Sequence, residues 1–280
     1  MDVGPLRDAL TVLLGLATGV LSGLFGVGGG VISQPGMRLL GLEPLMVIGT
    51  ALPVIIPGAL SGTRRYVREG LVRWPAVLAT VPAGLVAAVV GGIAAEEVPG
   101  DGHLLQLITA GLLGLSSWRM ARVPSSGVIE PDPGQPLAET DAPEVPQGLA
   151  RHLPPRDVLT RYAAIGLLAG GLSGLLGIGG GVIMVPAFVQ LTGMPVKAAI
   201  ATSLACVAAF AVPGTITHVV LDHVDWRVVA ALVAGVIPGA RLGAALTIRT
   251  ADRRLRVVVA SFLGLTAVVY AIGELAALLD

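Results

Sequence analysis

The sequence predicts an all-α integral membrane protein built from two inverted repeats of about five helical segments each. Of the 280 residues, 54% are hydrophobic and only 13% are charged, and the mean hydropathy is +0.84, which is far above that of a soluble domain. Four Phe, three Tyr and three Trp are too few for a soluble core of this size, whereas 39 glycines suit helices that approach closely in lipid. The third observation is an internal duplication.

The duplication aligns residues 15–95 with residues 166–247. The aligned features are a glycine at every fourth position, a glycine run, and single Thr and Trp residues: Gly15, Gly19 and Gly23 with Gly166, Gly170 and Gly174, residues 26–32 with 177–183, Thr50 with Thr202, and Trp74 with Trp226. So many matches in one order indicate two copies of one structural unit.

Each repeat divides into five apolar segments, which predict eight to ten transmembrane segments in total. They are 8–26, 28–42, 44–62, 74–95 and 103–118, then 158–177, 179–192, 196–220, 227–248 and 255–278. The first two segments of a repeat would together form a straight helix of roughly 50 Å, whereas the hydrocarbon core is about 30 Å thick. The glycine run between them therefore predicts half-helices or a re-entrant hairpin.

The charges of the loops predict opposite orientations for the two repeats. Positively charged loops face the cytoplasm. In the first repeat, the loop after the third segment carries Arg64, Arg65, Arg68 and Arg73, and the next loop has only Glu96, Glu97 and Asp101. In the second repeat the order is reversed, with Asp222, His223 and Asp225 in the third loop and Arg249, Arg253, Arg254 and Arg256 in the next. The repeats are therefore expected to be inverted, with both termini on the periplasmic side of a bacterial inner membrane.

The predicted domains are a first transmembrane repeat at 1–121, a flexible cytosolic linker at 122–157 and a second transmembrane repeat at 158–280. The linker is rich in Pro and acidic residues, and a simple tether is favoured over a regulatory segment. The net charge is zero, so neither nucleic acid nor an acidic partner is expected. The single cysteine, Cys206, excludes an internal disulfide and a multi-cysteine metal site. We expect no cofactor, no metal and no catalytic residue.

The glycine runs at Gly28, Gly29 and Gly30 and at Gly179, Gly180 and Gly181 are the main candidate site. They are not dinucleotide motifs, because Val31 and Val182 occupy the position of the third glycine, and they lack the Lys-Ser/Thr of a P-loop. Glycines allow positive φ angles, so the backbone can unwind and the following short helix can direct its positive end at an anion. The alternative is tight helix crossing. The occurrence of a glycine run at the same place in both repeats favours a substrate site.

Several polar side chains near the runs complete the predicted substrate site: Ser22, Ser173, Gln34, Thr50, Thr202, Ser203 and Arg241. For Ser22 and Ser173, a hydrogen bond to their own helix is an equal alternative. For Thr50, Thr202 and Ser203, the equal alternative is helix packing. Arg241 lies about 12 Å inside the membrane at 1.5 Å per residue, and its alternative role is snorkelling to the headgroups. The glycines at every fourth residue are expected to serve helix packing.

Four motifs resemble those of the TauE/SafE family of sulfite and organosulfonate exporters. They are Leu-Ser-Gly-Leu-Leu-Gly-Ile-Gly-Gly-Gly at 172–181, Ala-Thr-Ser-Leu at 201–204, Val-Asp-Trp at 224–226 and Pro-Gly-Ala-Arg-Leu-Gly at 238–243. The resemblance covers nearly all of the chain outside the linker. It implies export of a small sulfur-containing anion, such as sulfite or sulfoacetate, across the bacterial cytoplasmic membrane.

These features predict a secondary transporter that exposes its substrate alternately on the two sides of the membrane. The alternatives are a channel-like permease, a non-transporting structural or sensory membrane protein, and a membrane-embedded enzyme, for which the spans lack paired titratable groups. The expected partners are a small anionic substrate and the lipid bilayer. The sequence leaves open the substrate, the coupling ion and the oligomeric state, including a homo-oligomer.

Overall fold

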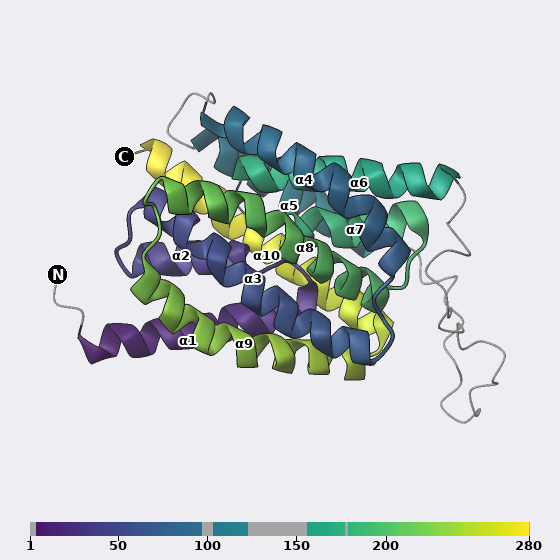
Figure 1. Cartoon of the computed structure of the whole chain (residues 1–280), viewed down its shortest axis with the longest axis horizontal. Coiled ribbons are helices and arrows are strands. Elements are labelled where there is room, and N and C mark those ends of the chain that lie inside the picture. The colour runs from purple at the N-terminus through teal and green to yellow at the C-terminus, as the bar shows by residue number, and fades with distance from the viewer. Residues whose placement is uncertain (1–3, 97–102, 123–155, 177–178, 280) are drawn as a thin grey trace.

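The computed structural model describes residues 4–96, 103–122, 156–176 and 179–279, and these residues form helices joined by short connections (Figure 1). The helices are α1 (Pro5–Phe25), α2 (Gly30–Leu39), α3 (Pro44–Arg68), α4 (Trp74–Glu96), α5 (His103–Arg122), α6 (Arg156–Leu176), α7 (Gly181–Thr192), α8 (Val196–Val220), α9 (Trp226–Arg249) and α10 (Asp252–Leu279). No strand occurs among the described residues. The all-α prediction is confirmed, and each predicted segment corresponds to one helix.

Helix length separates two short helices from the others. Five helices, α1, α3, α4, α8 and α9, are long and apolar enough to cross a membrane. In contrast, α2 has 10 residues and α7 has 12, so they extend over only about 15 and 18 Å at 1.5 Å per residue. The predicted half-helices are therefore confirmed. The third segment ends later than predicted, at Arg68 rather than residue 62, because the apolar pattern marks the membrane-embedded part and the helix continues beyond it.

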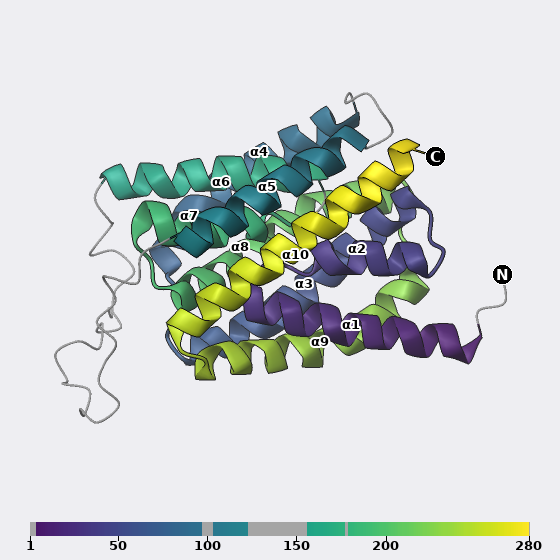
Figure 2. The same cartoon turned by 180° about the vertical axis from the view of Figure 1, so that it is seen from behind.

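The first helix begins and the last helix ends at the same end of the molecule. In Figure 1, α1 begins and α10 finishes near the left edge, whereas α6 begins at the opposite edge. Figure 2 shows the same relation from behind, with α10 crossing the molecule in front of α3 and α8. Most of the predicted linker, residues 123–155, lies outside the described residues, as do Glu97, Asp101, Gly177 and Ile178.

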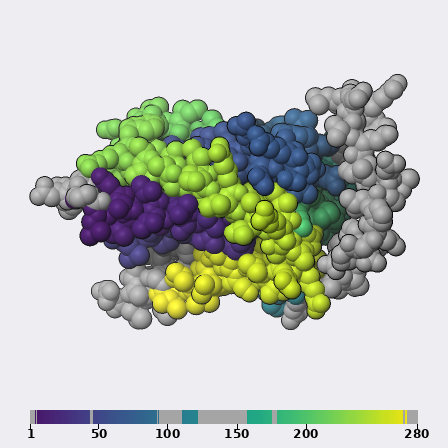
Figure 3. Space-filling model, turned by 90° about the horizontal axis from the view of Figure 1, so that it is seen from below, coloured from purple at the N-terminus to yellow at the C-terminus, as the bar shows by residue number. Residues whose placement is uncertain are grey.

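The first helix of one repeat packs on the fourth helix of the other, through backbone contacts at glycine. A methyl group added at Gly15, Gly19 or Gly23 of α1 would lie 2.3–2.4 Å from a carbonyl oxygen of α9, belonging to Leu232, Val236 and Ala240 in turn. Residue numbers rise together along the two helices, so α1 and α9 run parallel, and Figure 3 shows them side by side on one face. The predicted packing role of these glycines is confirmed.

The helices α4 and α6 form the equivalent pair. A methyl group at Gly166 would lie 2.2 Å from the carbonyl oxygen of Thr80, and one at Gly170 would lie 2.1 Å from that of Gly84. These helices also run parallel. Each repeat therefore supplies one helix to each of the two close-packed pairs, which interlocks the repeats.

The centre of the molecule lies between the third helices of the two repeats, α3 and α8, which contact each other. Of all the helices α8 contributes most to the interior, and its buried residues include Ile200, Leu204, Val207 and Phe210. Large apolar side chains such as Leu168 on α6 and Val86 on α4 are more than 60% exposed, as expected of surfaces that face lipid.

Candidate anion site at the helix breaks

Both glycine runs adopt backbone conformations that favour glycine. At the first break α1 ends at Phe25, and Gly26, Gly28 and Gly29 have φ angles of 71°, 82° and 86°. At the second break Gly179 and Gly180 have φ angles of 88° and 66° before α7 begins. Side chains with a Cβ atom rarely adopt these values. The prediction of an unwound backbone at the glycine runs is therefore confirmed for these residues.

The two breaks contact each other in the interior of the protein. A methyl group at Gly181 would lie 2.3 Å from the Gly26 carbonyl oxygen and 2.7 Å from Val27 Cα. Val207 of α8 and Ile55 of α3 lie against both runs. All described residues from Gly26 to Val31 and from Gly179 to Val182 are buried. The breaks therefore do not face lipid, which is the position that would favour a purely structural protein.

Side-chain hydroxyls close the C-terminal end of α1. The hydroxyl of Tyr66 donates to the Gly23 carbonyl oxygen at 2.5 Å, that of Thr247 donates to Leu24 at 3.0 Å, and that of Ser203 donates to Gly26 at 2.9 Å. The last carbonyl groups of a helix have no partner within the helix and carry its partial negative charge. Ser203 of α8 thus lies at the first break, and its hydroxyl proton is used by the backbone.

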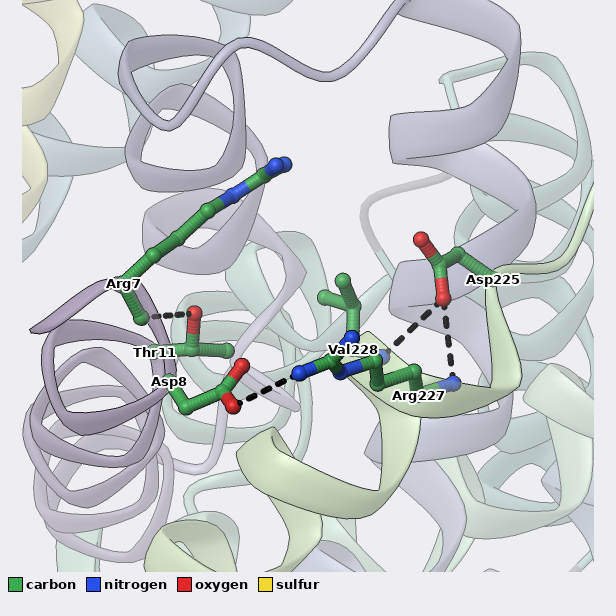
Figure 4. A network of polar contacts seen from close by, with 6 residues as sticks. All are labelled: Arg7, Asp8, Thr11, Asp225, Arg227 and Val228. Atoms are coloured by element: carbon green, nitrogen blue, oxygen red, sulfur yellow. Dashed lines mark hydrogen bonds and ion pairs between the residues drawn. The ribbon is translucent and has the colours of Figure 1, made fainter. Parts of the chain in front are cut away.

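The N-terminal ends of the two half-helices are arranged differently. Among the described residues no side chain caps α2 or α7. By comparison, the Asp225 carboxylate caps α9 and accepts from the backbone N–H groups of Arg227 and Val228, as Figure 4 shows. A helix N-terminus carries about half a positive charge. The ends of α2 and α7 are therefore the positive poles of the buried breaks.

Two residues of α1 that carry hydroxyl groups lie beside the first break. Ser22 is 1% exposed and Thr18 is 2% exposed, and their oxygen atoms have no hydrogen-bond partner within the described ranges. A methyl group at Gly29 would lie 2.8 Å from Thr18 Cγ2 and 3.6 Å from Ser22 Cβ. In the second repeat, Ser173 lies 3.4 Å from the equivalent point at Gly180. Thr18 was not predicted, although its position one helical turn before Ser22 was a usable signal.

Thr50 and Thr202 have structural partners. The Thr50 hydroxyl accepts from the backbone N–H of Asp225, and the Thr202 hydroxyl accepts from that of Arg73, both at 3.1 Å. Arg73 and Asp225 are equivalent residues of the two repeats, each just before the fourth helix. Each threonine thus fixes the loop before the fourth helix of the other repeat, which favours packing over contact with a ligand.

Gln34 and Arg241 differ in their relation to the breaks. Gln34 is half-buried on α2, one helical turn after Gly30. Arg241 is exposed on α9, where its Nε atom donates to the Ser61 hydroxyl of α3 at 3.1 Å. The structure therefore brings together the glycine runs, Ser22, Ser173 and Ser203, and leaves Arg241 on the surface.

Comparisons with known proteins agree with this architecture. The model of the family described as sulfite exporter TauE/SafE matches residues 11–270. The chain is 30% identical over 254 residues to the probable membrane transporter protein YunE of Bacillus subtilis strain 168, covering 85% of this chain and 87% of YunE. It is 27% identical over 242 residues to a probable membrane transporter protein of Xylella fastidiosa strain 9a5c, covering 86% and 85%. No solved structure matches the chain significantly.

Proposed function

This multi-pass membrane protein belongs to the sulfite exporter TauE/SafE family, and we propose that it exports a small sulfur-containing anion, such as sulfite or an organosulfonate, across the bacterial inner membrane. One observation carries the proposal. The helix breaks of the two repeats contact each other in the interior, and among the described residues each break is followed by a helix whose N-terminus no side chain caps. Such ends bind anions without a buried cation.

Alternating access is the proposed mechanism, and the direction of the packed helices supports it. If α1 and α2 form a re-entrant pair, the fourth helix of a repeat runs opposite to its first. Repeats in the same orientation would then place α1 and α9 antiparallel, whereas they run parallel. Inverted repeats can exchange conformations, and this exchange would open the site to the two sides in turn.

The proposed substrate contacts are the glycine runs together with Ser22, Ser173 and Gln34, whereas the Ser203 hydroxyl donates to the Gly26 carbonyl oxygen. Arg241 remains a prediction that the same assay tests. The membrane potential supplies about 2.3 kcal/mol per elementary charge per 100 mV for an anion that leaves a negative interior. Export of a monoanion therefore needs no coupling ion.

The test is flux through proteoliposomes that contain the purified protein, with sulfite, sulfate, sulfoacetate, taurine and carboxylates as substrates. We expect saturable flux of a sulfur oxyanion and a loss of at least tenfold in Gly180→Leu, because φ is +66° there and a Cβ would lie 2.6 Å from the Ala169 carbonyl oxygen. Gly111→Leu is the control, since a Cβ at Gly111 has no atom within 4 Å, and Arg241→Ala is assayed beside it.

The outcome distinguishes the alternatives. Absence of flux for every compound would contradict the proposed function. Flux that rises linearly without saturation would favour a channel-like permease. Unchanged flux in a monodisperse Gly180→Leu protein would remove the glycine runs from the substrate path.

A further inference from the structure

The hydroxyls of Thr18 and Ser22, like that of Thr63 on α3, have no hydrogen-bond partner in the described part of the chain, whereas other helical hydroxyls of this protein do. Thr11, on the same helix, donates to the Arg7 carbonyl oxygen four residues earlier at 2.8 Å, and Thr192 and Thr215 do the same on α7 and α8. This back-bonding is the usual fate of a hydroxyl inside a helix. The Thr18 and Ser22 hydroxyls are at least 98% buried and have no partner in the described part of the chain. A buried hydroxyl without a partner costs free energy, so the pair indicates an acceptor from outside the chain.

The side chains of Thr18 and Ser22 lie next to the positive end of α2. Both side chains lie against Gly29, the N-cap residue of α2, whose φ angle is 86°. Hydroxyl groups donate hydrogen bonds, and the N-terminus of a helix carries about half a positive charge. A ligand that only accepts hydrogen bonds and carries negative charge complements this arrangement, and an oxyanion meets both requirements.

The buried surroundings restrict the charge of that ligand. Apart from Tyr66, the buried polar side chains within the described residues are Thr or Ser, so no fully buried lysine or arginine there offsets a negative charge. The cost of moving an ion out of water rises with the square of its charge, so a dianion costs about four times as much as a monoanion of equal size. About half a positive charge at a helix N-terminus is better matched to one negative charge than to two.

The second break has a hydroxyl-bearing residue equivalent to Ser22 but none equivalent to Thr18. Ala169 occupies the position equivalent to Thr18, and its carbonyl oxygen lies 2.6 Å from a methyl group added at Gly180. Ser173 is equivalent to Ser22 and is also buried. The two breaks therefore differ in their number of buried donors, although their backbones are alike.

We propose that the first break binds one singly charged oxyanion between the Thr18 and Ser22 hydroxyls and the N-terminus of α2, and that the second break has no equivalent site. This inference rests on the proposed export of an anion and adds the binding residues and the charge of the substrate. It makes Thr18 a determinant of affinity.

The first experiment compares α1 variants by flux into proteoliposomes and by binding in detergent, with methanesulfonate and sulfite as ligands. Thr18→Val and Ser22→Ala are expected to raise the half-saturating concentration tenfold or more, and Thr18→Ser, which keeps the hydroxyl, to raise it less than threefold. Thr11→Val is the matched control and should leave it unchanged. The melting temperature of Thr18→Val without ligand should equal or exceed that of the wild type, because an unpaired buried hydroxyl is removed.

The second experiment tests the charge. Sulfite changes from a monoanion to a dianion as the pH rises through neutrality, whereas methanesulfonate stays a monoanion. Between about pH 6 and about pH 8, flux at a fixed total sulfite concentration should fall severalfold while methanesulfonate flux stays constant. A rise of sulfite flux with pH would overturn the inference.

The results separate this inference from the proposed function. Absence of flux in the wild-type protein would reject the export function itself. Wild-type flux with unchanged half-saturation in Thr18→Val and Ser22→Ala would reject only the site. A lower melting temperature in Thr18→Val with unchanged binding would assign Thr18 to structure and would reject the site as well.

Discussion

The threonines that open the third helices illustrate how similar residues take different roles at the scale of single side chains. Thr50 and Thr202 are fully buried and accept hydrogen bonds from backbone N–H groups of the opposite repeat. Thr18 is also buried but has no partner among the described atoms. The first two residues stabilise contacts between repeats, and the third is free to interact with substrate.

Thr202→Val is therefore expected to affect stability and not affinity. The change removes the acceptor of the Arg73 N–H, and an unpaired buried group costs about 1–3 kcal/mol. Thermal unfolding in detergent should show the loss, while the half-saturating substrate concentration stays within twofold of the wild type. Thr250→Val is the control, because its exposed hydroxyl bonds only to Leu246 of its own helix, and it should shift stability by less than about 0.5 kcal/mol. Raised half-saturation at unchanged stability would instead return Thr202 to the substrate site.

Sequence reasoning located single residues less well than elements, for a physical reason. The partners of Thr50 and Thr202 lie 175 and 129 positions away in the chain, and no local pattern specifies them. Arg241 was predicted at depth in the membrane, but the rotation of α9 places it on the exposed face beside Ser61. Thr18 was not predicted, although it lies one helical turn before Ser22 and therefore on the same face of the helix.

The elements themselves were predictable because length and composition constrain them strongly. An apolar stretch of about 35 residues is longer than a bilayer is thick, so it must be broken, and the glycine runs are the only segments there that can turn at low cost. The structure places α2 and α7 after these runs. The fourfold glycine spacing likewise predicted close helix contact, although it could not identify α9 as the partner of α1.

Gly19→Ala tests the contact between α1 and α9. Its Cβ would lie 2.4 Å from the Val236 carbonyl oxygen, so the helices must separate, and overpacking of this kind costs about 1–3 kcal/mol. Unfolding in detergent should show this loss, together with lower flux if the pair moves as a unit. Gly111→Ala, on α5, is the control because its Cβ has no atom within 4 Å, and it should be neutral or slightly stabilising. Equal stability of the two variants would contradict the close contact.

At the scale of the whole molecule, the helix contacts are repeated when the two repeats are exchanged. Exchange of the repeats turns the contact between α1 and α9 into the contact between α6 and α4. The contacts between α3 and α8 and between α5 and α10 are each turned into themselves. The side chains at the breaks do not follow this symmetry, since Thr18 and Ser203 are replaced by Ala169 and Ala51 in the other repeat. A symmetric scaffold with asymmetric breaks fits the proposed mechanism, in which two related conformations alternate while a single substrate is bound.

The proposed inversion of the two repeats predicts which loops are accessible from each side of the membrane. Glu69 follows α3 and Leu221 follows α8, and both are exposed. In a background in which the buried Cys206 is replaced by Ala, we expect a membrane-impermeant maleimide added to intact cells to label Leu221→Cys and not Glu69→Cys. Inside-out vesicles should give the reverse pattern, and solubilised protein, in which both sites should react, is the control for reactivity. Labelling of both positions from the same side would mean that equivalent loops share one face, and inversion of the repeats, with the alternating access built on it, would be excluded.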